Sequence, residues 1–489
     1  MSKVHLARSG FITKAALPSI TRQRGTTTGT STLMLFGAGK TTVSNNTTFI
    51  DSSTNAFTVT RVGDTVHSGH NPFSTVSDGS AYFDGTGDWL TLASNTAFDQ
   101  TVDFTVEAFV FFRAVPTGSF GNYGLIFGQE SSNMLKLGTS STGSGVFAFG
   151  VTKSGVGSLI VGTTSVSLNT WYHVALVKSG TGTNNIKLYV NGTQEGQATG
   201  GTAGSSTTVT YIGREGWVGD PAPLNGYVSN LRVVKGTAVY TANFTPPTSA
   251  LTAITNTQLL LLTDNYSIVN STPTPLPITI GGSAAISTAQ YPTGMTKSIF
   301  INGNSNYVDI AGSNGSANFT FGTGDVTIEL FAYHTTLSGT QNYYRTQGSG
   351  ANAVYLLRFT ANTIQWLIYD AVGTLLFSLT SSASLTSANT WYHIAAVRYG
   401  NVHTIYLNGV SIGTSTVSYS APAPQQDIGI GRGNFATGEN MVGYISNYRI
   451  AKGTAVYTAN FTPPSTPLSV NISVPAYVTN AIYGVNQLA

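Results

Sequence analysis

Two glutamates are the strongest candidates in the sequence for a hydrolytic site. Cleaving a glycosidic bond needs a pair of carboxylates that face each other across about 5–10 Å. Glu107 is followed by Ala-Phe-Val-Phe-Phe and Glu329 by Leu-Phe-Ala-Tyr-His, so neither run supplies the second carboxylate, and the chain holds only six glutamates. We therefore predict a protein without enzymatic activity, in which both glutamates accept hydrogen bonds from neighbouring backbone or hydroxyl groups.

Two histidines recur in one setting, because His173 and His393 each follow Trp-Tyr directly. A repeated histidine suits general base catalysis, but no serine elbow, cysteine or carboxylate stands at a useful spacing. Apolar residues alternate around both histidines and predict a strand that is apolar on both faces. We therefore expect packed, hydrogen-bonded rings rather than catalytic bases.

The segment Asp84-Gly-Thr-Gly-Asp88 is a candidate calcium site, because Ca²⁺ prefers carboxylate and other oxygen ligands. The corresponding segment in the second half runs from Asn302 to Asn306, which keeps the oxygens and loses both charges. A tight turn explains both versions, since Asp, Asn and Gly favour turns. Calcium binding by Asp84 and Asp88 and a purely structural turn both stay open, and no other cofactor is indicated.

A glycan site typically combines an exposed aromatic ring with polar groups beside it. Trp217 is the best candidate, because it lies in a Gly-rich segment between Arg214 and Asp220 rather than in a strand pattern. The alternative is a loop tryptophan that is buried on its own domain or in a subunit interface. The corresponding segment of the second half, 433–438, has no tryptophan, so such a site would be asymmetric.

Positive charge is concentrated at the N-terminus. The first 50 residues hold six cations and no acid, so the remaining residues carry 16 cations against 19 acids and are net −3. Five of these cations precede residue 25, namely Lys3, Arg8, Lys14, Arg22 and Arg24. Apolar residues between them favour an arm that docks on a neighbouring protein, and a solvated tail is the alternative. The aromatic pattern typical of nucleic-acid binding is missing.

The composition indicates a neutral, β-rich surface. Charged residues make up 8% of the 489 residues, while 24 Tyr, 24 Phe and 5 Trp supply bulky core side chains. The chain has no cysteine and no apolar run long enough to cross a membrane. Lys14 interrupts the only stretch that resembles an export signal. A surface of extracellular type without an export signal indicates assembly into a virus particle that is released by lysis.

Two repeats make up most of the chain. Residues 235–247 and 452–464 both read KGTAVYTANFTPP, and four further pairs of motifs recur upstream in the same order. Asn-Gly turns and the lack of a sustained helical period predict two antiparallel β-sandwiches. Each Thr-Pro-Pro should end a domain, because proline cannot donate to a strand ladder. The predicted parts are a basic arm at 1–30, a first domain at 31–250, a linker at 251–256, a second domain at 257–467 and a C-terminal extension at 468–489.

These motifs resemble the laminin-G-like, concanavalin-A-like jelly-roll family. The resemblance runs from YFDGTGDWLTL (82–92) through NTWYHVALVKSG (169–180) to GYVSNLRVVKGTAVYTANFTPP (226–247), and it returns between residues 300 and 464. It implies a two-sheet antiparallel sandwich, in some members with a calcium or glycan site at one rim. The segment KGTAVYTANFTPP, here called the closing motif, is similar to repeats in structural proteins of tailed phages. The family hosts many functions, so the fold does not fix the role.

Together these observations predict a structural protein of the virion, exposed on the surface of a tailed phage. A capsid-decorating or head-fibre protein fits better than a tail fibre, because no trimerising segment is visible. A tail-fibre or baseplate adhesin that recognises host-surface glycans is the alternative. We expect other virion proteins (major capsid or tail proteins) as partners, a homo-oligomer within the particle, no membrane insertion and no nucleic acid.

Overall fold

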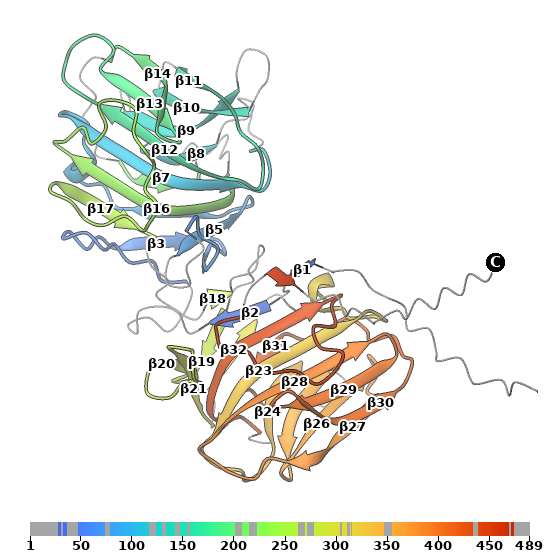
Figure 1. Cartoon of the computed structure of the whole chain (residues 1–489). Helices are drawn as coiled ribbons and strands as arrows, with labels where there is room; N and C mark the ends of the chain where they lie inside the picture. The colour runs from blue at the N-terminus through green and yellow to red at the C-terminus, as the bar shows by residue number, and fades with distance from the viewer. Residues whose placement is uncertain are drawn as a thin grey trace, which may run out of the picture.

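The computed structural model of the chain is all-β and contains two sandwich domains in tandem, which confirms the predicted fold class (Figure 1). The residues that the structure describes are 28–30, 33–36, 47–73, 79–116, 124–129, 134–141, 147–153, 157–200, 208–214, 223–262, 269–270, 278–303, 306–310, 313, 315–346, 355–433, 439–468 and 471–473. Within these ranges, no helix is long and apolar enough to span a bilayer.

Domain one consists of two antiparallel sheets. The first, here called the motif sheet because the segment KGTAVYTANFTPP covers it, has the order β4 (Val66–Ser68), β5 (Ser80–Asp84), β16 (Asn225–Lys235), β7 (Phe104–Phe112), β12 (Trp171–Lys178), β13 (Ile186–Val190) and β14 (Thr193–Ala198). The second, the seven-strand sheet, has the order β11 (Gly157–Ser165), β10 (Phe147–Lys153), β9 (Leu135–Ser141), β8 (Leu125–Gln129), β15 (Thr210–Ile212), β6 (Trp89–Leu92) and β3 (Val59–Val62). A short 3-10 helix, η1 (Thr96–Phe98), precedes β7.

Domain two repeats this arrangement. Its motif sheet has the order β20 (Ala285–Ser287), β21 (Ser298–Asn302), β32 (Val442–Lys452), β23 (Val326–His334), β28 (Trp391–Tyr399), β29 (Val402–Leu407) and β30 (Val410–Thr416). Its seven-strand sheet has the order β19 (Ile278–Gly281), β22 (Tyr307–Ile310), β31 (Ile428–Ile430), β24 (Gln341–Thr346), β25 (Tyr355–Thr360), β26 (Thr363–Tyr369) and β27 (Leu375–Ser384). The 3-10 helix η2 (Ala317–Phe319) corresponds to η1.

The closing motif explains why the central strands are apolar on both faces. On β12, Val174 and Leu176 point into the core between the two sheets. Val177 points the other way, and there Tyr240 and Phe244 of the closing motif pack over it. The rings of Tyr240 and Phe244 stack with their centroids 3.6 Å apart. The identical 13-residue motif is therefore an outer layer of the core in each domain.

Each Asn-Gly turn is shaped to receive this layer. Gly192 has a φ of +78°, in the left-handed region that favours glycine. A Cβ there would overlap the carbonyl oxygen of Phe244, whose backbone N–H donates to the carbonyl of Gly192 at 2.9 Å. Gly409 and Phe461 make the same contact in domain two. The repeated turn signal thus anchors the repeated closing motif.

Strand pairing corrects two of the predicted domain assignments. β17 (Thr257–Leu261), predicted to open the second domain, pairs with β16 of domain one, where Leu259 lies opposite Val233. β2 (Leu33–Phe36), predicted to lie in the first domain, pairs with β32 of domain two, where Leu33 lies opposite Ile450. Figure 1 shows the blue β2 among the yellow and red strands of domain two. The two pairings use equivalent positions of the repeat.

The physical reason is that Thr-Pro-Pro ends the closing motif but not the sheet. In domain one the chain runs on past Pro247 and returns to β16 as β17. In domain two the following segment forms β33 (Asn471–Ser473), which pairs with β1 (Thr28–Thr30) instead. The place beside β32 is thus filled by β2 from the N-terminal side of domain one. β18 (Val269–Asn270) pairs with both β2 and β4 and so connects the two domains.

Candidate functional site

Glu107 lies at the centre of a buried polar cluster in domain one. Its Oε1 accepts hydrogen bonds from Nε and Nη2 of Arg232 at 2.9 and 2.6 Å. Its Oε2 accepts from Nε2 of His173 at 3.0 Å and from the hydroxyl of Tyr240 at 2.7 Å. Three strands and the closing motif therefore meet at one carboxylate that is closed to solvent.

Domain two contains the same cluster around Glu329. Arg449 donates from Nε at 2.8 Å, His393 from Nε2 at 3.2 Å and Tyr457 from its hydroxyl at 2.7 Å. Both glutamates and both histidines are at most 1% exposed. The motifs that recur in the sequence therefore supply the same buried cluster in each domain.

These glutamates are held in the charged state. Burial by itself raises the pKa of Glu107, but the hydrogen bond from His173 and the charge of Arg232 outweigh it and leave the pKa below its ordinary value. The pKa of Glu329 is lowered in the same way by His393 and Arg449. The oxygens of both carboxylates accept hydrogen bonds from fixed donors, so neither carboxylate is placed to exchange a proton with a substrate. The expectation of packed histidines is confirmed. The glutamates accept from a hydroxyl group as expected, that of Tyr240 or Tyr457, and their other donors among the described residues are arginine and histidine side chains rather than backbone groups.

The predicted calcium ligands Asp84 and Asp88 lie together at one rim of domain one, with a third acid, Asp64. Each of the three has an oxygen within 4.8 Å of the others. Asp88 is buried, and its Oδ1 and Oδ2 accept from the backbone N–H of Asp64 at 2.7 Å and of Asp84 at 3.0 Å. Asp88 therefore ties the β3–β4 turn to the β5–β6 turn. Sequence spacing gave no signal for Asp64, because it belongs to a different hairpin.

The acids at this rim are crowded. Burial, together with a hydrogen bond to the Asp64 carboxyl group, raises the pKa of Asp88 to about 7. A hard cation held by oxygen ligands would relieve this crowding, as would a proton. In domain two, Oδ1 of Asn306 accepts from the backbone N–H of Ser283 at 2.5 Å, which ties the same two turns without charge. The tie is thus common to both domains, and calcium stays a prediction for domain one alone.

Arg214 lies next to this rim. Its guanidinium carbon stands 3.9 Å above the ring of Trp89, which directly follows Asp88 in the chain. Such stacking fixes the plane of the guanidinium and leaves its N–H groups at the ring's edge. Trp217 and Asp220, predicted to complete a glycan site with Arg214, lie outside the described residues. The aromatic partner that the structure gives Arg214 is Trp89, which sequence reasoning missed.

Domain two carries the same stack at the equivalent place. The guanidinium carbon of Arg432 stands 3.8 Å above the ring of Tyr307. Arg432 also forms an ion pair with Asp309 through Nη1 and Oδ2. The signal was present in the repeat, since each of Arg214 and Arg432 follows an Ile-Gly pair whose isoleucine ends strand β15 or β31. The basic arm, with Lys3, Arg8, Lys14, Arg22 and Arg24, lies outside the described residues.

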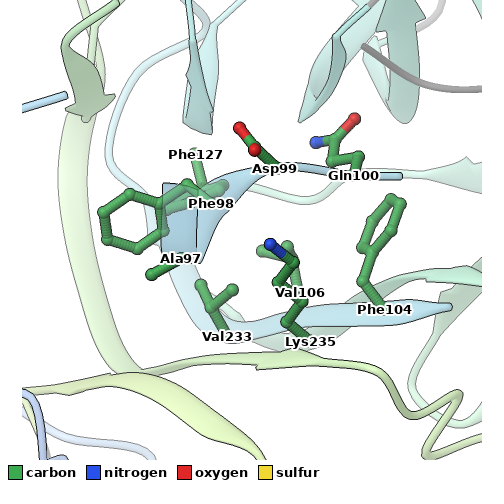
Figure 2. A pocket seen from close by; sticks show the side chains of 9 residues that line it. All are labelled: Ala97, Phe98, Asp99, Gln100, Phe104, Val106, Phe127, Val233 and Lys235. Carbon is green, nitrogen blue, oxygen red and sulfur yellow. The ribbon is translucent and has the colours of Figure 1, made fainter. Parts of the chain in front are cut away.

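A small pocket lies beside η1 in domain one (Figure 2). It offers a water-sized molecule a volume of about 10 Å³, which is room for about one water. Nζ of Lys235 donates to the carbonyl of Thr96 at 2.5 Å, and the side chain of Gln100 bonds to both backbone groups of Leu135 at 2.9 and 2.7 Å. The polar groups at this pocket are used by the fold, and it is too small for a sugar ring.

Residues 84–239 and 302–455 both match the family model described as the concanavalin A-like lectin/glucanases superfamily. The chain belongs to this superfamily. The two matched segments lie one in each sandwich and include the glutamate, the histidine and the arginine of each buried cluster, which confirms the resemblance drawn from the motifs. No curated protein sequence matches this lectin/glucanase superfamily chain.

Several solved structures are similar to this superfamily member. Domains LG4-5 of the mouse laminin alpha1 chain share 14% identity with a TM-score of 0.31, over 79% of this chain and 94% of that one. The SAP-like pentraxin of Limulus polyphemus shares 18% identity with a TM-score of 0.30, over 40% of this chain and 95% of that one. The binding domain of Paraclostridial Mosquitocidal Protein 1 shares 15% identity with a TM-score of 0.29, over 36% of this chain and 44% of that one. The chain thus spans less than half the length of the last of these.

Proposed function

We propose that this chain is a non-enzymatic surface protein of a tailed phage particle, and that its two sandwiches contact glycans. The observation that carries the proposal is the arginine held flat on an aromatic ring at the same rim of both domains, Arg214 on Trp89 and Arg432 on Tyr307. Arg214 is half-buried, whereas Arg432 is buried and paired with Asp309, so the rim of domain one is the more accessible of the two. A guanidinium fixed in this way presents several N–H donors in one plane. Sugar hydroxyls and ring oxygens are acceptors that such donors can bind.

Binding without catalysis is supported by the state of the repeated acids. Glu107 and Glu329 are each held by an arginine, a histidine and a tyrosine in the interior of the motif sheet. A retaining or inverting glycosidase needs an acid and a second carboxylate that reach a substrate from opposite sides. Here the repeated acids hold strands together instead.

The particle surface is supported by the sequence. Only 8% of the residues are charged, and the first 24 residues hold five cations that suit docking on a neighbouring subunit. The closing motif resembles repeats in structural proteins of tailed phages. Within the particle we favour a capsid-decorating or head-fibre position, with major capsid proteins as partners. Membership of a lectin superfamily favours the second candidate, a tail-fibre or baseplate protein that binds host-surface glycans.

Glycan contact is tested by binding the full chain to an array of bacterial surface polysaccharides. The double variant Arg214→Ala/Arg432→Ala should lose about tenfold or more in affinity, because both rims lose their fixed donors. Lys187→Ala is the matched control, since this cation lies on the motif sheet and donates to the carbonyl of Thr241. Equal binding by the parent chain and the double variant would contradict the proposal.

A further inference from the structure

Domain two carries four aromatic rings side by side on the outer face of its motif sheet. They come from four adjacent strands and lie opposite one another in register, namely Phe300 of β21, Tyr444 of β32, Tyr333 of β23 and Trp391 of β28. Neighbouring ring centroids are 5.0, 5.6 and 5.3 Å apart in that order. On each strand an adjacent residue belongs to the core between the sheets, so the rings point outward. We call this feature the aromatic row.

Domain one carries the same row and covers it with its own side chains. The rings there are those of Tyr82, Tyr227, Phe111 and Trp171. The ring of His70 lies 4.8 Å from that of Tyr227 and 4.7 Å from that of Phe111. The guanidinium carbon of Arg113 stands 5.8 Å from the ring centre of Tyr82, and its Nη1 donates to the hydroxyl at 2.8 Å. An imidazole and a guanidinium therefore occupy this surface.

Domain two lacks both covering side chains. Ala289 stands at the place of His70, because the backbone N–H of each donates to the serine hydroxyl two residues earlier, at 3.1 and 3.0 Å. Thr335 stands at the place of Arg113, because the backbone N–H of each donates to the first residue of the last long strand, at 3.0 and 2.9 Å. The repeat thus supplies matched residues for exchange between the domains.

The aromatic row of domain two consequently stays open to solvent. Tyr227 of domain one is 0% exposed, whereas its counterpart Tyr444 is only half-buried, and so are the other three rings of the row. Ala289 and Thr335 are themselves exposed. Among the described residues, no cation lies over a ring of this row. Because the faces of aromatic rings attract cations, the open row favours a basic partner.

The sequence contains one segment with this chemistry. The first 24 residues hold Lys3, Arg8, Lys14, Arg22 and Arg24 and no acid. His5 precedes Arg8 by three residues, so the segment offers an imidazole and a guanidinium together, which are the two groups that cover the row in domain one. The remainder of the chain is net acidic, so attraction between the segment and another copy is also favoured.

We propose that residues 1–24 of a second copy of this chain dock on the aromatic row of domain two, with their basic side chains on the rings. The chain's own N-terminal side joins domain two at a remote place, since Leu33 of β2 lies opposite Ile450, about 20 Å along β32 from Tyr444. Docking of one copy on the next is a heterologous contact, which builds a ring or a filament. The inference goes beyond glycan contact and does not depend on it.

The experiment measures association of the full chain by sedimentation velocity over a range of concentrations. The parent chain should associate. Ala289→His/Thr335→Arg gives domain two the covering side chains of domain one and should weaken association by about tenfold or more. Both positions are exposed, so the fold tolerates the change. Replacing the five cations of residues 1–24 with Gln should weaken association equally. Lys187→Ala, elsewhere on a motif sheet, is the control and should associate like the parent.

Disulfide trapping identifies the occupant, because the chain has no cysteine of its own. A chain with Ser9→Cys mixed with a chain with Thr335→Cys should give a mixed dimer. Val372→Cys, at an exposed turn of the seven-strand sheet, is the control and should give none. A disulfide that forms only within a chain carrying both Ser9→Cys and Thr335→Cys would make the chain's own segment the occupant and overturn the second copy.

Three further outcomes would overturn the inference. They are a parent chain that stays monomeric at every concentration, association that survives Ala289→His/Thr335→Arg, and loss of polysaccharide binding in that variant with association unchanged. The last would make the aromatic row a glycan surface. The proposed function is tested separately, because the arginines that it invokes, Arg214 and Arg432, are intact in all these variants.

Discussion

Glu107 and Arg232 form an ion pair that is closed to solvent, although 125 residues separate them in the chain. Glu329 and Arg449 form the same pair in domain two at a separation of 120 residues. Each pair joins the first long strand of its motif sheet to the last. The tyrosine of the closing motif completes each cluster, so residues from several of the repeated motifs bond to one another at the same buried carboxylate.

Removing the carboxylate should be costly, because a buried arginine then loses its counter-charge. We expect Glu107→Gln to destabilise domain one by about 3–5 kcal/mol, and Glu329→Gln to do the same to domain two. Urea unfolding of the full chain, monitored with a probe in each domain, measures the loss of stability in both variants. A loss below about 1 kcal/mol in either variant would show that the cluster does not hold the sheet together.

The same glutamates predict a dependence on acid. Their pKa values are lower in the folded chain than in the unfolded one, so the charged form is favoured by folding. This contribution is fully present above the unfolded value of about 4.3 and is lost as the pH falls through the folded pKa values. Melting temperature should therefore drop between pH 5 and pH 3. Both Glu→Gln variants should show a shallower drop, and parallel curves would contradict the assignment.

Asp88 predicts the opposite trend in domain one. Its pKa is raised to about 7 in the fold, so ionisation on going from acid to pH 8 destabilises the folded state. Asp88→Asn introduces the residue that domain two has at Asn306, and it cannot ionise. We expect the stability of the variant relative to the parent to rise by about 1–3 kcal/mol between pH 5 and pH 8.

Calcium provides a second measurement on the same variant. If the three acids hold the ion, millimolar Ca²⁺ should stabilise the parent chain at pH 8 and leave Asp88→Asn unchanged. Equal responses of the two proteins would exclude this rim as a calcium site, while the pH trend would still test the crowded carboxyl groups.

The pairing of the N-terminal strand β2 with domain two predicts the effect of a truncation. Deleting residues 1–36 removes β2 and leaves β32 without the partner that β16 finds in β17. We expect domain two to lose about 3 kcal/mol or more and domain one to keep its stability. Calorimetry of the full and truncated chains resolves the two transitions. A drop confined to domain one, or none in either domain, would refute the closure of domain two by β2.

Much of the fold was predictable because its signals are local or repeated. The duplicated closing motif, the Asn-Gly turns and the alternation around His173 each report on a few neighbouring residues. The pairing of β2 with domain two and of β17 with domain one left no such signal, because a short apolar strand does not encode which sheet edge it joins. Asp64 and Trp89 were missed for a related reason, since their partners lie on other hairpins.

The candidate sites were predictable only in part. Asp84 and Asp88 were singled out as candidate calcium ligands because they share one turn, and Arg214 as a candidate glycan contact because it lies beside a Gly-rich segment; both stay predictions.

The most direct test of a phage surface protein is immunogold labelling of intact particles with an antibody against domain two. A protein exposed on the particle surface should carry gold on the outside of every particle, spread over the head for a decorating or head-fibre protein. Gold confined to the tail would move the protein to the host-attachment apparatus and favour the second candidate. Particles that carry the protein in their composition and yet bind no gold before disruption would contradict surface exposure and, with it, the proposed function.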